Sequence, residues 1–339
     1  MNKITSKLRP KKSQKPGRIT DGNIEEHREE AIARGKKFKY PFQYAKHRLV
    51  IITVIIAVVT LALFSVFGWF QLYRFQNMSD IVYRFTRVIP MPVAEIDGAH
   101  VLYSDYLMLF RSSIRAIENQ QGELADSEED TQLRNQYKRQ SLDSAIQYAF
   151  ALKLAKELDI TITQEQIDEV VREHRTVDGV ERSEAAFAEI INHNFGLSLN
   201  EYERLLFLSL AKKEVSIAID ETATKLATEV EQLLAANNND LAATTKALSG
   251  PIVYEETGGM VDIMNLDGGR AALAATLEIG QVSSRFTSKN GDGFYFVKLL
   301  AKSENQVNYA SIWIEFTEFN NRIQSLREND KIREFIHLD

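Results

Sequence analysis

The sequence predicts a mainly α-helical chain with one transmembrane helix and a small α+β domain near its C-terminal end. Three observations indicate this fold class. A run of 22 residues, 49–70, contains no charged side chain. No proline occurs between Pro92 and Pro251, which favours long helices. Eight of the 16 glycines lie in residues 250–293, among short runs rich in β-branched and aromatic residues, which favours strands joined by turns.

The N-terminal tail, residues 1–48, carries 14 Lys/Arg and 5 Asp/Glu. It is poor in apolar residues, so we expect it to be largely disordered, with a short helix over residues 23–34. At about 1.5 Å per residue, the run 49–70 is long enough to cross a hydrocarbon core of about 30 Å. Positive charge beside a span stays in the cytoplasm. The sequence therefore predicts a single-pass protein of the cell membrane, with a cytoplasmic N-terminus and an extracytoplasmic body.

Two alternatives to a signal anchor at residues 49–70 are a cleaved signal peptide and a buried helix of a soluble core. The run is longer than the 7–15 apolar residues usual in a signal peptide, and no small-x-small cleavage site follows it. Charge-free runs of this length are rare in soluble cores. The sequence favours an uncleaved signal anchor.

Composition excludes several kinds of chemistry. The chain has no cysteine, so disulfides and thiolate catalysis are excluded, and a cysteine-free exported domain suits a bacterial cell envelope. Residues 49–339 have a formal net charge of −15, which disfavours nucleic acid as a partner. His174 and His193 are isolated, and no phosphate-binding glycine motif occurs. The sequence predicts no metal site and no cofactor, and it favours exposed loop positions for Glu255 and Glu256.

A juxtamembrane segment, residues 71–92, follows the span. Its pattern over 71–87 is amphipathic, so we expect the helix to continue outward until Pro90 and Pro92 end it.

The helical region, residues 93–220, begins with an expected hairpin whose turn is Asp97-Gly98. Ser104 and Asp105 are expected to cap the helix that follows. Two further helix starts have capping boxes, in which a Ser or Thr precedes a Gln or Glu by three residues: Thr163 with Gln166, and Ser198 with Glu201. A long helix is indicated by apolar residues at every fourth position: Leu142, Ile146, Phe150, Leu154 and Leu158.

The last region, residues 221–339, predicts an amphipathic helix and then an antiparallel sheet, because short β-prone runs alternate with glycine turns. The run Asn290-Gly-Asp-Gly293 predicts a turn between two strands. We expect a final helix over residues 318–336. The β-prone runs are 251–254, 282–287, 294–300 and 307–316.

Three ordered motifs carry a family resemblance: AEIDGAHVLYSDYLMLF, LDSAIQYAFALKLAKELDITITQEQIDEVV and AFAEIINHNFGLSLNEYERLLFLSLAKKEV. Together they cover about residues 93–219. Their order of hairpin, long helix, capped helix and second capped helix resembles the N-terminal domain of the SurA, PrsA and PpiD group of extracytoplasmic chaperones.

The segments TGGMVDIM and LEIGQVSSRFTSKNGDGFYFVKLL make residues 222–302 similar to a parvulin-type prolyl isomerase domain. The sequence differs from that family at the histidine pair of its active site, because residues 221–335 contain no histidine. The last-strand histidine corresponds best to Tyr295. The first strand is absent, and we expect residues 307–316 to supply this missing edge strand, with Ser311 at the place of the other histidine. Met260 completes the candidate pocket.

These resemblances imply a membrane-anchored chaperone or foldase-like protein, with an N-terminal chaperone domain and a degenerate parvulin-like domain. It would bind unfolded or newly exported polypeptides, close to the translocation machinery, with weak or absent isomerase activity. Two alternatives stay open: an active peptidyl-prolyl cis-trans isomerase with an atypical site, and a non-enzymatic scaffold of the envelope.

Overall fold

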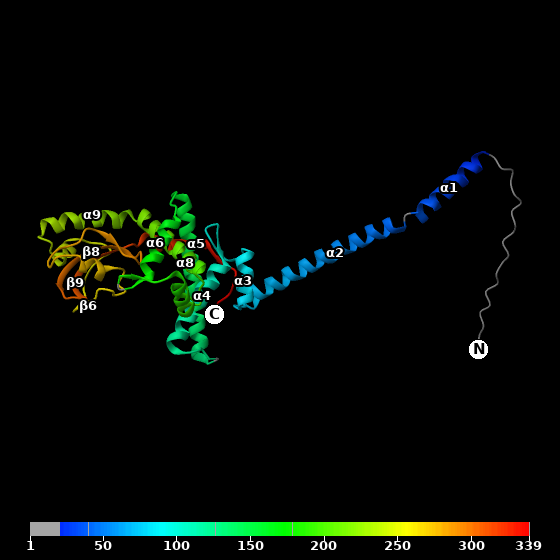
Figure 1. Cartoon of the computed structure of the whole chain (residues 1–339). Helices are drawn as coiled ribbons and strands as arrows, with labels where there is room; N and C mark the ends of the chain where they lie inside the picture. Colours follow the sequence, from blue (N-terminus) through cyan, green and yellow to red (C-terminus); the bar gives the residue numbers. More distant parts are fainter. Residues whose placement is uncertain (1–20, 40, 126, 178, 339) are drawn as a thin grey trace. The chain divides into compact units, whose positions relative to one another are not determined.

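The computed structural model describes residues 21–39, 41–125, 127–177 and 179–338 (Figure 1). The chain divides into two compact units, Met1–Phe70 and Gln71–Asp339. The predicted fold class is confirmed: the chain is mostly helical, with a smaller antiparallel sheet in its C-terminal part.

The first unit is helical throughout its described residues. Helix α1 spans Asp21–Lys39 and helix α2 spans Pro41–Trp69. The predicted short helix over residues 23–34 is present within α1, but α1 is longer at both ends, so the prediction of a largely disordered tail is wrong for the rest of residues 21–39. Helix-forming Glu, Ala, Arg and Lys dominate here, and Arg34 pairs with Glu30 one turn away at 3.3 Å. The prediction for residues 1–20 lies outside the described residues.

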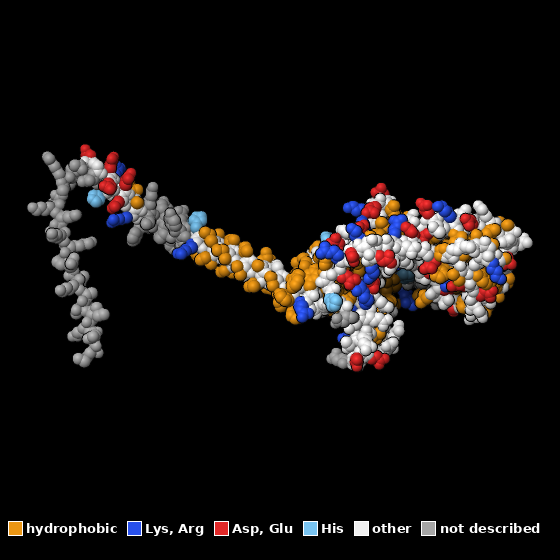
Figure 2. All heavy atoms as spheres, turned by 180° about the vertical axis from the view of Figure 1, so that it is seen from behind, with side chains coloured by type: hydrophobic (Ala, Val, Ile, Leu, Met, Phe, Trp, Pro, Cys, Tyr) orange, Lys and Arg blue, Asp and Glu red, His pale blue; other side chains and the backbone are white. Residues whose placement is uncertain are grey.

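One helix of the described chain, residues 47–74, is long and apolar enough to cross a membrane. Its aliphatic side chains are exposed from Leu49 to Val66, and Figure 2 shows hydrophobic side chains all along this stretch. It ends in a π-helical turn, η1 (Phe70–Arg74).

The helix does not continue to residue 87 as predicted. It breaks after Arg74, and a separate helix, α3 (Asp80–Val88), begins after Ser79. The break has a local cause in Asn77, whose amide group donates to Gln71 Oε1 and accepts from the Ser79 amide, each at 2.9 Å. Side-chain bonds of this kind compete with helical backbone bonds. Proline follows the end of α3 as predicted.

The helical domain begins with the predicted hairpin, β1 (Pro92–Ile96) and β2 (Ala99–Leu102). Asp97 and Gly98 both have positive φ, as a tight hairpin turn requires. The small hairpin β3 (Thr176–Val177) and β4 (Val180–Glu181) lies later in the domain. The helices are α4 (Tyr103–Gln121), α5 (Glu128–Glu157), α6 (Gln164–Arg175), α7 (Glu184–Phe195) and α8 (Leu199–Ile219).

Both predicted capping boxes are present, at the starts of α6 and α8. The predicted cap of α4 is wrong, because α4 already begins at Tyr103 and has no side-chain cap. The Tyr103 amide instead donates to the Met91 carbonyl at 2.8 Å. Asp105 is consequently available to pair with Arg204 of α8 at 2.8 Å, which joins two helices.

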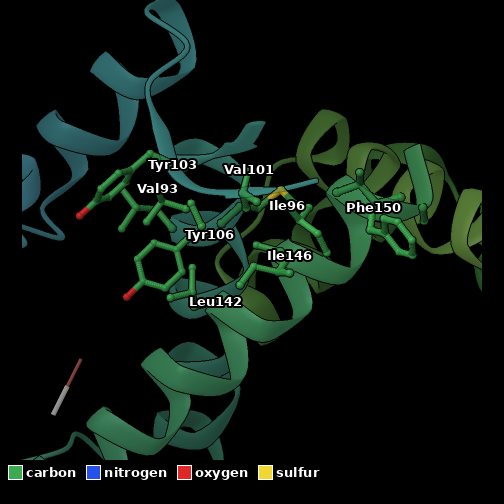
Figure 3. Close-up of a cluster of buried hydrophobic side chains, with 14 of the residues drawn as sticks. Val93, Ile96, Val101, Tyr103, Tyr106, Leu142, Ile146 and Phe150 are labelled. Carbon is green, nitrogen blue, oxygen red and sulfur yellow. The ribbon is translucent and has the colours of Figure 1, made fainter. Parts of the chain in front are cut away.

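The core of the helical domain lies where the β1–β2 hairpin packs on α4 and α5. Figure 3 shows these side chains pointing toward one another. Tyr103 and Tyr106 are fully buried, with their rings edge to face at 5.7 Å. The other labelled core residues are Val93, Ile96, Val101, Leu142, Ile146 and Phe150.

The C-terminal segment returns to this helical core. Helix α12 spans only Glu318–Glu328, and strand β10 (Ile332–Glu334) follows it, so the predicted helix over residues 318–336 is wrong beyond 328. Asp330 has a φ of 53°, which ends the helix and turns the chain. β10 then pairs antiparallel with β1.

Contacts of the C-terminal segment show which domain it completes. Phe319 packs on Phe150 at 5.6 Å, and Ile336 is buried in the same core. Arg139 of α5 makes a bidentate pair with Glu334 at 2.7 and 2.8 Å. The predicted C-terminal domain over residues 221–339 therefore needs correction, because its last segment belongs to the helical core.

The sheet domain lies between α8 and α12. One face of the sheet is covered by α9 (Glu221–Ala236) and α10 (Leu241–Ala247), and the other by α11 (Arg270–Ala275). The strands, all antiparallel, run in the order β5-β9-β8-β7, and β6 also pairs with β9. Their bounds are β5 Ile252–Glu256, β6 Val261–Asp262, β7 Phe286–Thr287, β8 Gly293–Lys302 and β9 Gln306–Glu315.

Two strand predictions need correction. The run 307–316 does lie in the sheet, as β9, but it is an interior strand between β5 and β8 rather than an edge. Its alternate residues are buried on both faces, which suits an interior position. Of the run 282–287, only Phe286–Thr287 forms a strand, and Val282 makes a single bridge to Lys298.

Candidate functional site

A polar cavity of about 240 Å³ opens on the α11 side of the sheet. Its position follows from strand register: Glu255 of β5 lies opposite Ser311 of β9, and alternate residues of one strand share a face. Tyr309 therefore stands beside Ser311 on the same face. The lining residues are Glu255, Glu256, Thr257, Val261, Asn265, Asp267, Arg270, Tyr309 and Ser311.

Charged and phenolic side chains on this face of the sheet are hydrogen-bonded to one another. The Tyr309 hydroxyl donates to Asp267 Oδ2 at 2.6 Å, and Arg270 donates to Glu255 Oε2 at 2.8 Å. The Arg270 guanidinium also lies 5.0 Å from the centroid of the Tyr295 ring. Burial and the carboxylate of Asp267 raise the pKa of Tyr309, so its hydroxyl stays protonated and acts as a donor.

Ser311 is the exception in this network. Its side chain is fully buried, and its Oγ has no hydrogen-bond partner among the described residues. A buried hydroxyl without a partner costs about 1–3 kcal/mol. The cavity therefore contains an unused donor and acceptor beside a fixed cation, Arg270.

The structure brings together two of the three candidate site residues. Tyr295 lies opposite Trp313, and Val297 opposite Ser311, so Tyr295 and Ser311 occupy one face of the sheet on adjacent strands. Tyr295 is turned toward Asp292, to which its hydroxyl donates at 3.0 Å, and it does not line the cavity. Met260 lies in the loop between β5 and β6, half-exposed and also outside the lining.

Sequence reasoning missed the charged part of this cavity. Glu255, predicted as an exposed loop acid, lies on β5 and holds Arg270. Asp267 and Arg270 flank two glycines that read only as a turn. The one sequence signal for them is the order Asp-Gly-Gly-Arg, in which the Asp267 carboxylate accepts from the Ala271 amide in the first turn of α11.

Replacing Ser311 with alanine should stabilise the sheet domain by about 1 kcal/mol, because it removes a buried hydroxyl that has no hydrogen-bond partner. Denaturant unfolding of the full chain in detergent micelles measures this change. Ser283→Ala is the matched control. Its Oγ accepts from the buried Val297 amide at 3.0 Å, so this variant should lose stability. A destabilised Ser311→Ala variant would mean that the Ser311 hydroxyl does have a hydrogen-bond partner.

A second, larger hollow of about 860 Å³ lies where the helical domain meets the sheet domain. The β3–β4 hairpin contributes Val177 and Gly179, and the end of β6 with the segment after it contributes residues 262–266. Met264 is 55% exposed and Leu266 is completely exposed, so the margin of the hollow carries apolar surface. An adjoining hollow of about 440 Å³ shares Gly179 and Met264 and has a charged lining, Glu169, Arg172, Glu173 and Lys289.

No group of three or more His, Asp or Glu side chains in the described part of the chain is placed to hold a metal ion.

The fold and these surfaces define a two-domain protein: a helical domain closed by its own C-terminal strand, with an inserted α+β domain. A family model for the SurA-like N-terminal domain matches residues 42–216, just over half of the chain. The chain belongs to this family, which indicates a chaperone-type protein concerned with protein folding. The match begins within α2 and so includes the whole of the apolar helix. No individual curated protein matches the chain in a sequence comparison.

Proposed function

We propose that this chain is a membrane-anchored chaperone that binds unfolded or newly exported polypeptides outside the cytoplasm. Family membership supports the chaperone role. The apolar helix supports a single span, and the 14 Lys/Arg of residues 1–48 support a cytoplasmic N-terminus. A body with a net charge of −15 stays soluble while it carries an apolar client. The translocation machinery is the partner we expect to deliver such clients.

The observation that carries this proposal is the large hollow beside the β3–β4 hairpin. Methionine and leucine exposed at its margin, Met264 and Leu266, can accommodate many different apolar side chains, because methionine in particular is flexible and polarisable. β6 and β4 are both outer strands of their sheets. An extended client can therefore combine side-chain burial here with backbone pairing.

We further propose that the sheet domain is a degenerate parvulin-like domain in which β9 takes the place of the missing first strand. Rotation about a prolyl bond is opposed by a barrier of about 18–20 kcal/mol, and a catalyst must bind the twisted amide with fixed hydrogen bonds. The cavity contains Arg270 and Ser311 but no histidine pair, and most of its polar groups are already bonded to one another. This favours weak or absent isomerase activity.

The double variant Met264→Ser/Leu266→Ser should reduce suppression of client aggregation several-fold, because it removes the exposed apolar side chains of the hollow. The measurement is light scattering of several unrelated unfolded proteins mixed with the full chain in lipid nanodiscs. Ile279→Ser is the matched control, since Ile279 is 65% exposed but lies outside the hollow. Suppression that survives the double variant would place the client elsewhere, and one tight complex with a single partner would favour a scaffold.

A second candidate function is prolyl isomerisation, which the unpartnered Ser311 hydroxyl favours. We expect no acceleration of a proline-limited refolding reaction by the full chain. Acceleration that falls in both Tyr295→Phe and Ser311→Ala would instead establish an active site on this face of the sheet. Acceleration that is unchanged in both variants would place the active site elsewhere.

A further inference from the structure

Helix α3 (Asp80–Val88) has two faces with opposite environments. One face packs on the helical domain, where Tyr83 and Thr86 are buried. The other carries Ile81, Phe85 and Val88, which are spaced i, i+4 and i+7 and therefore form one stripe. Ile81 and Val88 are each 81% exposed, and Phe85 is 42% exposed. An apolar stripe with this exposure has no covering partner among the described residues.

The buried face of α3 is fixed firmly to the domain. The Tyr83 hydroxyl donates to Glu201 Oε1 at 2.5 Å, and Arg87 pairs with the same oxygen at 3.2 Å. Burial alone would raise the pKa of Glu201, but hydrogen bonds from Ser198 and Tyr83 lower it overall, so the carboxylate is ionised and retains Arg87. The Arg111 guanidinium of α4 lies 4.7 Å from the centroid of the Tyr83 ring. α3 and the helical domain consequently move as one body.

Sequence distance indicates what covers the exposed stripe. The apolar helix ends at Arg74, and α3 begins six residues later at Asp80. Six residues span at most about 22 Å, so a chain anchored by that helix keeps α3 close to the bilayer surface. Arg84 lies on the exposed side of α3, between the apolar residues in sequence. At a bilayer surface its guanidinium could pair with lipid phosphate groups.

We propose that α3 is an interfacial helix whose stripe of Ile81, Phe85 and Val88 inserts into the lipid headgroup region of the leaflet facing the body. The occupant is phospholipid, not a second copy or a client. This inference rests on the membrane span of the proposed function, but it is independent of which side of the membrane the body occupies. Because α3 is fixed to α4 and α8, the contact sets the angle of the helical domain to the bilayer plane.

The absence of cysteine from the chain permits a direct test with single-cysteine variants. Val88→Cys is labelled with an environment-sensitive fluorophore in the full chain, reconstituted in phosphatidylcholine–phosphatidylglycerol vesicles. Val180→Cys is the matched control, a valine 67% exposed on β4. We expect a blue-shifted emission for the label at 88, and several-fold stronger quenching by nitroxide-labelled lipid than for the label at 180.

Retention of the full chain in vesicles after alkaline washing is measured in the same samples. Retention combined with a water-like, unquenched label at position 88 overturns the inference and leaves the anchored chaperone intact. A blue-shifted label at 88 that nitroxide-labelled lipid does not quench also overturns the inference. If that shift grows with protein density, the stripe is covered by protein. Release of the chain by alkaline washing would show that it does not span the membrane, which would contradict both this inference and the proposed membrane-anchored chaperone.

Discussion

Replacing Phe319 with alanine should destabilise the helical domain by about 3–5 kcal/mol, although Phe319 follows the sheet domain in sequence. Its side chain is 2% exposed and packs against Phe150 of α5, in the core that the β1–β2 hairpin and α4 complete. Truncation leaves a cavity that surrounding helices cannot fill. Hydrogen exchange of the full chain in detergent micelles should show loss of protection in α5 and β1.

Phe195→Ala is the control for this substitution. Phe195 ends α7 and is 38% exposed, so its truncation should change stability much less. Loss of protection limited to β8 and β9 in Phe319→Ala would contradict the assignment of α12 to the helical core.

Replacing Gly293 with alanine should destabilise the sheet domain by about 1–3 kcal/mol or more. A Cβ at this position would overlap the Ile314 carbonyl oxygen, and it would lie 2.5 Å from the Trp313 indole nitrogen. The obstructing atoms include backbone of the central strand β9, which cannot move without disturbing β5 on its other side. The midpoint of denaturant unfolding and the near-ultraviolet signal of Trp313 measure the effect.

Gly259→Ala is the matched control for Gly293→Ala. No atom lies within 4 Å of a Cβ built at Gly259, and its φ is not positive, so this variant should keep the stability of the parent. Equal stability of the two variants would mean that β8 and β9 are farther apart at Gly293 than the structure places them.

Elements coded by neighbouring residues were predictable. The Asp97-Gly98 turn, the two capping boxes and the four-residue period of α5 each depend on contacts within one or two turns, which the sequence displays directly. The C-terminal return was not predictable in this way. β10 has three residues, too few for a period, and it forms only because β1, more than 200 residues earlier, offers a free edge.

The candidate site was predictable in part. The resemblance placed Ser311 on a strand, and the structure places it in a polar cavity. The cation of that cavity, Arg270, was not predicted, because its neighbours Asp267 and Glu255 come from separate loops and strands that only the folded sheet brings together. The large hollow was missed for the same reason: Val177 and Gly179 have no sequence pattern in common with residues 262–266.

The pairing of β10 with β1 has a consequence for the order in which the protein matures. Residues 221–316 of the sheet domain emerge from synthesis before α12 and β10, so the sheet can assemble while the helical core still lacks Phe319 and Ile336. The helical domain reaches its final packing only once its last strand has emerged. A nascent chain whose last residues have not yet emerged would therefore present an incompletely packed helical domain.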